Sequence, residues 1–382
     1  MSPFGPLTRR LAALDARSRR RVLAPRAGKD FASNDYLALA GDPAIAAAIA
    51  DAAGRGVAAG AGGSRLLRGN APQHEALEEK AAGFFGAESA LFFSSGFSAN
   101  AALLATLPQP GDLIVADALI HASVHEGIRL TRAAHRLASH NDAAAVEAVI
   151  AEWRADGGAG TAWIAVESVY SMDGDIAPLA DLVAVADRHD AVLIVDEAHG
   201  TGIMGPGGRG LAAPYEGREN IIVLHTCGKA MGVEGALVTG PAIVKDYLVN
   251  RARGFIFSTA PSPLIAVAVG AAIDRMERAD DRRAALDALR AHAGRSICAP
   301  LGLPAPVSPI LPIILGADAR AMAVAAELQE AGFDIRGIRP PTVPAGTARL
   351  RITLTLNIAP TDIDALAPVL MAALATHGRA AA

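Results

Sequence analysis

Between residues 89 and 240, short apolar runs alternate with amphipathic stretches of helical period, and this pattern constrains the fold more than any other feature of the chain. Runs such as LIVAD (113–117) and VLIVD (192–196) lack the polar alternation of a strand with one face in water, so we expect both faces of these strands to be covered. A parallel sheet with helices on both sides has this property. The sequence therefore predicts an α/β fold with a mostly parallel central sheet flanked by helices.

The same pattern predicts the individual elements. We expect strands at 89–93, 112–117, 161–168, 191–199, 220–226 and 235–240, with intervening helices that include 98–107 and 179–190. Beyond about residue 270, a strand at 309–316, a helix near 318–331 and a strand at 348–357 indicate a smaller α+β unit. We therefore expect an N-terminal helix and short strand arm (1–40), a large α/β domain (41–272) and a small C-terminal domain (273–382).

The last of these strands alternates strictly between apolar and polar residues, as a half-solvated antiparallel strand does. The residues expected on its buried face are Leu350, Ile352, Leu354 and Leu356. Those expected on its solvated face are Arg349, Arg351, Thr353 and Thr355.

The composition argues against several classes of protein. A net charge of −4 gives no electrostatic case for a nucleic-acid partner, and apolar runs such as 264–273 are too short to cross a bilayer. Cys227 and Cys298 lie far apart and lack a metal-ligand spacing, which fits a reducing compartment. The arginine-rich N-terminus favours an amphipathic surface helix over a transit peptide. We expect a cytoplasmic protein that binds neither nucleic acid nor membrane.

Polar residues gather where the expected strands end. They are Ser94 to Gly96, Glu167 and Ser168, Asp196 to His199, and Thr226 to Lys229. In open α/β sheets the ligand binds beyond the carboxyl ends of the strands. We therefore expect these segments to converge on one site.

The segment LFFSSGFSANAAL (91–103) reads as a strand, a Ser-Ser-Gly turn and a helix. Such a turn directs backbone N–H groups and the positive end of a helix dipole at one point, which suits a phosphate. An ordinary turn with serine capping has the same pattern, so the segment alone leaves both interpretations open. GPGGRG (205–210) has the glycine spacing of a dinucleotide site, but no amphipathic helix follows it, and we interpret it as a flexible loop.

Asp196 ends a strand of apolar residues, where a carboxylate is costly unless it is paired. The sequence Asp-Glu-x-His contains metal-ligand residue types, so a metal site is one interpretation. However, Asp196 and Glu197 would point to opposite faces of a strand, and no second ligand cluster follows nearby. Pairing with a protonated pyridine nitrogen is the better interpretation.

Lys229 is one of four lysines in a chain with 31 arginines. An amine can lose a proton and form an imine with a carbonyl group, which a guanidinium cannot. Gly228 and Gly232 flank Lys229 and permit close approach of a ligand, although a surface lysine would be the simplest interpretation of Lys229 alone. A phosphate-binding turn, a buried strand-end acid and this amine together supply what pyridoxal phosphate requires.

Several motifs then recur in the order seen in a known family: GSRLLRGN, SSGFSAN, HASVHEG, SMDGDIAPL, DEAHGTG and TCGKAMG. With them, essentially the whole chain resembles the α-oxoamine synthases, fold-type-I pyridoxal-phosphate enzymes whose fold is like that of aspartate aminotransferase. The stretch GIRPPTVPAGTARLRITLT (337–355) most strongly favours the family member that joins L-alanine to a pimeloyl thioester in biotin biosynthesis.

The resemblance implies roles around the cofactor ring. Lys229 would form the Schiff base, Asp196 would pair with the pyridinium, and His199 would hydrogen-bond the phenolic oxygen. His121 would stack on the ring, and Ser171 would be a further polar neighbour. Without the resemblance, His121 could equally be satisfied locally at the start of a helix.

The resemblance also implies phosphate ligands and a homodimer with shared active sites. The amides of Gly96 and Phe97, together with Thr226, would bind the phosphate. Thr259 would reach it from the second subunit.

For the substrates, the resemblance implies that Arg339 binds the amino-acid carboxylate, with Asn34 and Thr342 nearby. Taken alone, Arg339 could be a solvated loop arginine, although a guanidinium suits a carboxylate well. Arg19 would meet the distal carboxylate of the acyl chain, but the run RSRRR leaves the choice of arginine open.

The implied reaction is a decarboxylative condensation that releases carbon dioxide and the thiol carrier, either coenzyme A or an acyl carrier protein. Glycine C-acetyltransferase, 5-aminolevulinate synthase and serine palmitoyltransferase share the cofactor motifs and are the nearest alternatives. A non-catalytic scaffold on the same fold and a dinucleotide-dependent oxidoreductase are more distant alternatives, the latter depending on GPGGRG alone.

Overall fold

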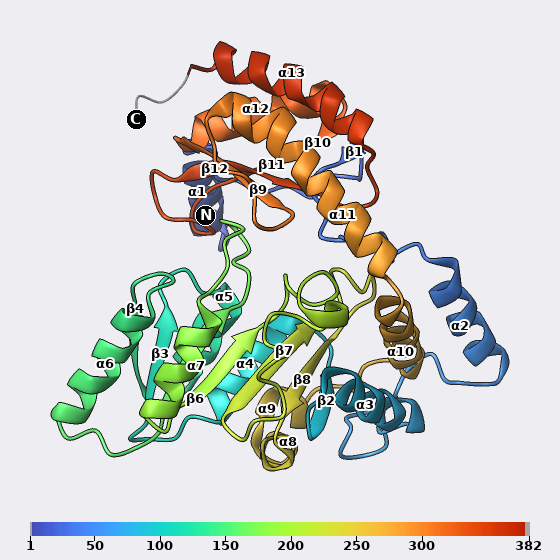
Figure 1. The fold of residues 1–382 in the computed structure, drawn as a ribbon, viewed down its shortest axis with the longest axis vertical. Helices are drawn as coiled ribbons and strands as arrows, with labels where there is room; N and C mark the ends of the chain where they lie inside the picture. The colour runs from blue at the N-terminus through green and yellow to red at the C-terminus, as the bar shows by residue number, and fades with distance from the viewer. Residues whose placement is uncertain (1, 379–382) are drawn as a thin grey trace. The chain divides into compact units, whose positions relative to one another are not determined.

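The computed structural model describes residues 2–378, and Figure 1 shows the order of its elements. The chain divides into two compact units. The large unit contains residues 35–171 and 175–284, and the small unit contains residues 2–34, 172–174 and 285–378 of the described chain. Helix α11 (Asp280–Ala293) contains the point at which the chain last passes from the large unit to the small one.

The large unit is built on a seven-stranded sheet with the strand order β2-β8-β7-β6-β5-β3-β4. The strands are β2 (Ser89–Phe93), β3 (Leu113–Asp117), β4 (Ala134–Ala138), β5 (Ala162–Glu167), β6 (Val192–Asp196), β7 (Ile221–Thr226) and β8 (Ala236–Gly240). Strands β4, β3, β5, β6 and β7 are parallel to one another, whereas β8 runs antiparallel to both β7 and β2. The predicted α/β fold with a mostly parallel central sheet is confirmed.

The large unit also contains α-helices. They are α2 (Pro43–Gly54), α3 (Pro72–Phe85), α4 (Gly96–Thr106), α5 (Ala122–Leu130), α6 (Ala143–Ala155), α7 (Leu179–Arg188), α8 (Ala242–Arg251), α9 (Arg253–Ile256) and α10 (Pro263–Glu277).

Both faces of the sheet are buried, as the continuous apolar runs predict. Along β3, Ile114 and Ala116 join a core cluster that includes residues of α4 and α5. Leu113 and Val115 point the other way and join a second cluster with residues of α6 and α7. Because successive side chains of a strand alternate between faces, a strand with two buried faces must be apolar throughout.

The small unit contains a three-stranded antiparallel sheet of order β11-β12-β9. Its elements are α1 (Gly5–Asp15), β1 (Lys29–Asp30), β9 (Ile310–Gly316), α12 (Asp318–Glu330), β10 (Phe333–Asp334), β11 (Arg336–Ile338), β12 (Ala348–Thr353) and α13 (Pro360–Thr376). None of the eleven residues of α1 is buried, which agrees with a surface helix. Over residues 2–378, no helix is long and apolar enough to cross a membrane.

The expected exposure of β12 is wrong, although its antiparallel pairing is confirmed. Arg349 is 3% exposed and Arg351 is 6% exposed. The Arg349 guanidinium forms an ion pair with Asp173 of the same unit, and Arg351 donates to Asn34 Oδ1 at 3.0 Å. These partners replace the water that the alternating pattern implied, and Thr353 and Thr355 are buried as well.

Candidate active site

The carboxyl ends of β5, β6 and β7 open onto a cavity of about 160 Å³ within the large unit. The residues that line it come from several separate segments, as the convergence of polar strand ends predicts. They are Gly96, Phe97, Asn100, His121, Ser123, Glu167, Asp196, Ala198, Leu224, Thr226 and Lys229. The predicted lysine, strand-end acid and phosphate turn therefore share one cavity.

Lys229 lies in the turn that follows β7, and its Nζ is 2.8 Å from Nε2 of His199. The other ring nitrogen of His199, Nδ1, is 2.6 Å from the hydroxyl of Tyr36. His199 and Tyr36 are both buried, so this chain of contacts fixes the approach of the amine to the cavity. The close approach expected near Gly232 is a backbone contact: Gly232 has φ +67°, and a Cβ there would lie 2.2 Å from Ala40 N.

Asp196 is 5% exposed and accepts two hydrogen bonds inside the large unit. Asn100 Nδ2 donates to Oδ2 at 2.7 Å, and the amide of Ala198 donates to Oδ1 at 2.8 Å. Both donors favour the ionised carboxylate. Asp196 therefore presents a negative charge at the cavity wall, as a partner for a cationic ring nitrogen requires.

Glu197 points to the opposite side of β6, as expected for neighbouring strand residues. Its carboxylate accepts from Ser168 Oγ at 2.6 Å and from the amide of Ala212 at 2.5 Å. Gly210 packs against this carboxylate, since a Cβ at Gly210 would lie 2.6 Å from Glu197 Cδ. The GPGGRG segment is thus a loop with a short turn at Pro206–Gly208 that packs against a buried acid, and its flexibility remains a prediction.

Glu167 is a second buried carboxyl group in the cavity wall. Burial raises its pKa to about 8, and the nearby Asp196 charge adds to the rise. Its Oε2 accepts from the amide of Ser171 at 3.1 Å, while its Oε1 has no hydrogen-bond partner among residues 2–378. Glu167 is consequently neutral at pH 7 and can donate a hydrogen bond into the cavity.

His121 caps the N-terminus of α5, where its Nδ1 is 2.8 Å from Ser123 Oγ. Burial lowers the pKa of His121, and Asp196 only partly offsets this effect. The ring is therefore a neutral imidazole at pH 7. It is satisfied locally and also lines the cavity, so the two interpretations of this residue are compatible.

The Ser-Ser-Gly turn is a serine-capped helix start, and phosphate binding there remains a prediction. Ser95 Oγ accepts from the amide of Ser98 at 3.1 Å, which is a helix cap at the start of α4. The amides of Gly96 and Phe97 form no hydrogen bond within residues 2–378, and a Cβ at Gly96 would lie only 3.2 Å from Thr226 Oγ1. The helix N-terminus, its open amides and Thr226 form a cradle for an anion.

This donor set fits pyridoxal phosphate. An amine, a carboxylate and an anion cradle line one cavity, and two buried acceptor atoms there, Glu167 Oε1 and Asn100 Oδ1, have no partner among the described residues. Bound pyridoxal phosphate would supply an aldehyde for Lys229, a ring nitrogen for Asp196 and a phosphate for the cradle.

Ser171 and Thr259 are not among the described residues that line this cavity. Ser171 is adjacent through its backbone, because its amide contacts Glu167. Thr259 lines a separate small cavity together with Arg65 and Ser94. Contact of Thr259 with a cofactor bound to a second subunit remains a prediction.

The predicted substrate residues belong to the small unit. Arg339 is 8% exposed; its Nη2 donates to the Arg20 carbonyl at 2.7 Å, and its Nε has no hydrogen-bond partner within residues 2–378. Burial lowers the pKa of Arg339, with Arg21 adding to the effect. A buried guanidinium with donor capacity left over suits an anionic substrate group.

The other three substrate candidates already have partners within the small unit. Thr342 accepts from Arg21 at 3.1 Å, and Asn34 accepts from Arg351. Arg19 donates to Asp318 at 2.5 Å. Their roles toward substrate remain predictions.

Sequence reasoning missed Asn100, Ser123 and Tyr36, which hold Asp196, His121 and His199. Asn100 lies in the motif SSGFSAN and Ser123 in HASVHEG, whereas Tyr36 lies in the stretch SNDYLAL (33–39). A polar residue within a largely apolar helix, as Asn100 is in α4, was the available signal.

Comparisons with known proteins match the chain to one enzyme family and its named members. A family model for aminotransferases of class I and II matches residues 28–370. An 8-amino-7-oxononanoate synthase from Azoarcus sp. (strain BH72) is 43% identical over 94% of this chain and 95% of its own. One from Chromobacterium violaceum is 42% identical over 89% of this chain and 88% of its own.

Solved structures give the same result. A serine palmitoyltransferase from S. paucimobilis with a bound PLP adduct of myriocin superimposes with a TM-score of 0.89 at 26% identity, covering 98% of both chains. An 8-amino-7-oxononanoate synthase from Francisella tularensis superimposes with a TM-score of 0.77 at 29% identity, covering 91% of this chain and 98% of the other.

Proposed function

Because this chain belongs to the aminotransferase class I and II family and is 42–43% identical to two 8-amino-7-oxononanoate synthases, we propose that it condenses L-alanine with a pimeloyl thioester, from coenzyme A or an acyl carrier protein. The products are 8-amino-7-oxononanoate, carbon dioxide and the free thiol carrier, in the biotin pathway. The cofactor is pyridoxal 5′-phosphate. The observation that carries the proposal is the placement of Lys229, Asp196 and the Gly96–Phe97 cradle on one cavity.

The bound cofactor supplies an electron-accepting ring and an aldehyde for imine formation. Lys229 provides the amine that would hold the cofactor. When the amino-acid substrate takes its place, the free amine of Lys229 would remove the proton from the Cα of that substrate. His199 lies 2.8 Å from Nζ and orients that amine. Asp196 keeps the ring nitrogen protonated, with Asn100 and Ala198 stabilising its charge.

The remaining cavity residues set the position of the ring. The neutral ring of His121, which lines the cavity, would stack on the cofactor ring, and Thr226 with the amides of Gly96 and Phe97 would bind the phosphate. Glu167 is uncharged at pH 7, so it adds no second negative charge beside Asp196. Ser171 is a further polar neighbour of the cofactor through its contact with Glu167.

For the substrates, we assign the amino-acid carboxylate to Arg339, with Asn34 and Thr342 nearby. The Arg339 guanidinium is buried and pairs with no carboxylate among residues 2–378, which suits it to bind such a group. Arg19, or a neighbour in the same run, binds the distal carboxylate of the pimeloyl chain.

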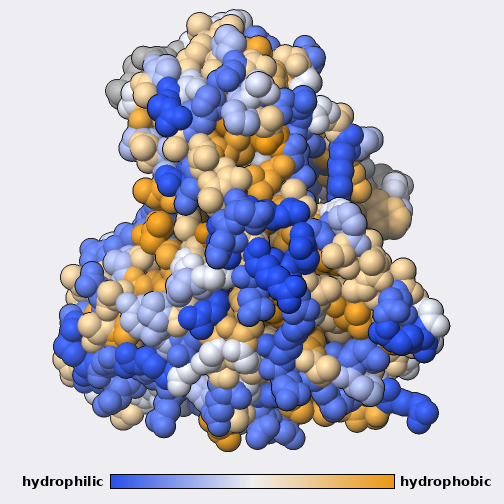
Figure 2. Space-filling model, turned by 45° about the vertical axis from the view of Figure 1, so that its right-hand side comes forward, coloured by the Kyte–Doolittle hydropathy of each residue, from blue (hydrophilic) through white to orange (hydrophobic). Residues whose placement is uncertain are grey.

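We also infer a cytoplasmic homodimer in which Thr259 of each subunit reaches the phosphate in the other. Large apolar side chains near the cradle and near Thr259 are exposed, with Phe97 at 51% and Phe257 at 72% exposure. Figure 2 shows further hydrophobic residues that reach the surface among hydrophilic ones on the face drawn there. Exposed apolar area of this kind is buried in an assembly.

The closest rival activity is serine palmitoyltransferase, which the structural superposition favours by TM-score. Purified protein loaded with pyridoxal phosphate is to be assayed with alanine, glycine and serine, each against pimeloyl, acetyl, succinyl and palmitoyl thioesters. We expect turnover with alanine and a pimeloyl thioester to exceed every other pair by at least about tenfold, the scale of one well-formed contact. No turnover with that pair overturns the proposal.

A further inference from the structure

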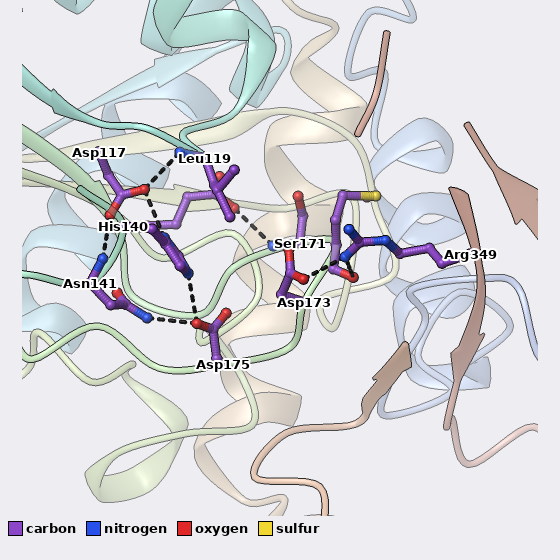
Figure 3. A network of polar contacts seen from close by, with 10 residues as sticks. Asp117, Leu119, His140, Asn141, Ser171, Asp173, Asp175 and Arg349 are labelled. Atoms are coloured by element: carbon purple, nitrogen blue, oxygen red, sulfur yellow. Dashed lines mark hydrogen bonds and ion pairs between the residues drawn. The ribbon is translucent and has the colours of Figure 1, made fainter. Parts of the chain in front are cut away.

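Five side chains near the carboxyl ends of β3 and β5 form a polar cluster in the large unit, and none of them lines the cofactor cavity. They are Asp117, His140, Asn141, Tyr170 and Asp175, called here the His140 cluster. Figure 3 shows His140 between the two carboxylates, with Asn141 alongside.

His140 contacts a carboxylate with each ring nitrogen. Nδ1 is 2.8 Å from Asp117 Oδ1, and Nε2 is 2.7 Å from Asp175 Oδ2. Ionised carboxylates only accept hydrogen bonds, so both ring nitrogens must donate, and only the imidazolium can do this. Burial alone would lower the pKa of His140, but its bonds to Asp117 and Asp175 raise it to about 10.

Asp117 connects this imidazolium to the turn that carries His121. Asp117 ends β3, is 4% exposed and accepts from the amides of Leu119 and Asn141, each at 2.8 Å. The amide of Ile120 donates to the Asp117 carbonyl at 3.1 Å. The next residue is His121, so the shape of this turn sets where the His121 ring enters the cavity.

Asp175 connects the same imidazolium to the segment after β5. The amide of Tyr170 donates to the Asp175 carbonyl at 3.0 Å, and Val169 pairs with Ile176 in an antiparallel bridge. The Tyr170 ring meets the His140 ring edge-on, with centroids 4.4 Å apart. The following residue, Ser171, is the one whose amide contacts Glu167 in the cavity wall.

We propose that His140 is a positioning residue for the cofactor site, whose imidazolium joins Asp117 to Asp175 and thereby fixes the turn before His121 against the segment that contacts Glu167. His140 touches neither the cavity nor its lining and acts through the two carboxylates. The inference rests on the proposed roles of His121 and Glu167 toward the cofactor.

Removal of the imidazolium leaves two carboxylates facing a neutral group, and their mutual repulsion then separates the two segments. A purely structural histidine would lower thermal stability and leave the cofactor ring undisturbed. The two cases differ in affinity for pyridoxal phosphate and in the visible circular dichroism of the bound cofactor, which reports the asymmetric environment of its ring.

The test uses full-length wild-type protein, three single variants and one double variant. His140→Gln is neutral and cannot donate from opposite sides of a ring, and Asp175→Asn keeps the side-chain shape and removes one charge. His189→Gln is the matched control, because His189 is also a partly buried histidine paired with a carboxylate, that of Glu147 at 3.2 Å, away from the cavity. Apo-protein is titrated with pyridoxal phosphate and followed by visible absorbance and circular dichroism.

For His140→Gln, we expect the dissociation constant for pyridoxal phosphate to rise about tenfold, the usual effect of losing hydrogen bonds to charged groups. The visible circular-dichroism band should weaken, kcat should fall more than KM changes, and His189→Gln should match wild type in all three. In the double variant His140→Gln, Asp175→Asn, the dissociation constant should rise by less than the product of the two single-variant factors, because both substitutions break one network.

A dissociation constant within twofold of wild type with an unchanged dichroism band overturns the proposal, as does an equal change in His189→Gln. If His140→Gln shows no cooperative unfolding transition and so fails to fold, Asp175→Asn takes its place in the test. We expect its dissociation constant for pyridoxal phosphate to rise at least threefold, and a smaller rise refutes the proposal. Both readouts are independent of turnover. A wild-type protein that binds the cofactor but does not condense alanine with a pimeloyl thioester would refute the proposed function and leave this test valid.

Discussion

The substitution Asn100→Ala tests whether Asp196 needs its buried donor to act on the cofactor. Asn100 is 1% exposed, and its Nδ2 is 2.7 Å from Asp196 Oδ2 and 3.0 Å from Ser123 Oγ. A hydrogen bond to a charged group contributes about 1.5–3 kcal/mol. Its loss weakens the ionised form of Asp196 and hence the pair between that carboxylate and the cofactor ring nitrogen.

If this loss appears in cofactor binding, the dissociation constant for pyridoxal phosphate rises roughly ten- to hundredfold. The assay is a titration of apo-protein with pyridoxal phosphate at pH 7.5, followed by visible absorbance. The control is Asn220→Ala, because Asn220 also donates to a carboxylate, that of Asp187 at 3.2 Å, but lies outside the cavity. A change below threefold in Asn100→Ala, or an equal change in the control, would refute the reasoning.

Three further predictions follow from backbone geometry and charge. Gly232→Ala should lower the free energy of unfolding by at least about 1–3 kcal/mol, because φ is +67° and the new Cβ meets the Ala40 backbone. Gly254→Ala is the control and should not lower it, because a Cβ at Gly254 meets no atom within 4 Å. Urea titration of both variants makes the comparison. The stabilisation from His140 should be fully present below pH 6.5 and lost as the pH rises through about 10, because folding raises the pKa of His140. Unfolding curves of wild type and His140→Gln from pH 6 to 10.5 test this. The variant should lack the part of the stability loss that comes from His140. Glu167→Gln should keep at least about a third of wild-type turnover at pH 7, because the pKa of Glu167 is raised to about 8 and glutamine mimics the neutral acid. The unfolding stability of wild type should fall relative to that of this variant between pH 4.5 and 8. A hundredfold loss of turnover at pH 7 would contradict the neutral state.

The central strands could be predicted because each is buried on both faces. Strands β3, β6 and β7 are apolar over nearly their full length, so their position and their parallel neighbours follow from the pattern. Strand β4, with the sequence AHRLA, was missed because it lies at the sheet edge and is mostly exposed or half-buried. An edge strand needs no apolar run, and helix α6, which follows it, was missed with it.

The strict alternation of β12 predicted the wrong exposure for its polar residues. A strict period of two indicates that the two faces differ in polarity, and it does not show that the polar face meets water. Arg349 and Arg351 are buried because Asp173 and Asn34 supply acceptors for them. Those acceptors lie more than 150 residues away in the chain, and no local pattern indicates them.

At the candidate site, the residues with distinctive chemistry were predictable and their supports were not. Lys229 and Asp196 stand out because an amine or a carboxylate at a buried strand end needs a reason. Asn100 and Tyr36 support Asp196 and His199 through hydrogen bonds, and such pairing depends on tertiary contacts over 96 and 163 residues. His140 escaped notice for the same reason, because its partners Asp117 and Asp175 lie in different segments.

The central claim is that the amine of Lys229 holds the cofactor, which an arginine at the same position cannot do. The most direct measurement is borohydride reduction of protein loaded with pyridoxal phosphate, followed by proteolysis and mass spectrometry, on wild type, Lys229→Arg and Lys245→Arg. Lys245 pairs with Glu78 outside the cavity and serves as the control. The account predicts that the reduced cofactor is attached to Lys229 in wild type and in Lys245→Arg, and to no residue in Lys229→Arg. Attachment at another lysine, or retention of the attached cofactor in Lys229→Arg, would contradict it.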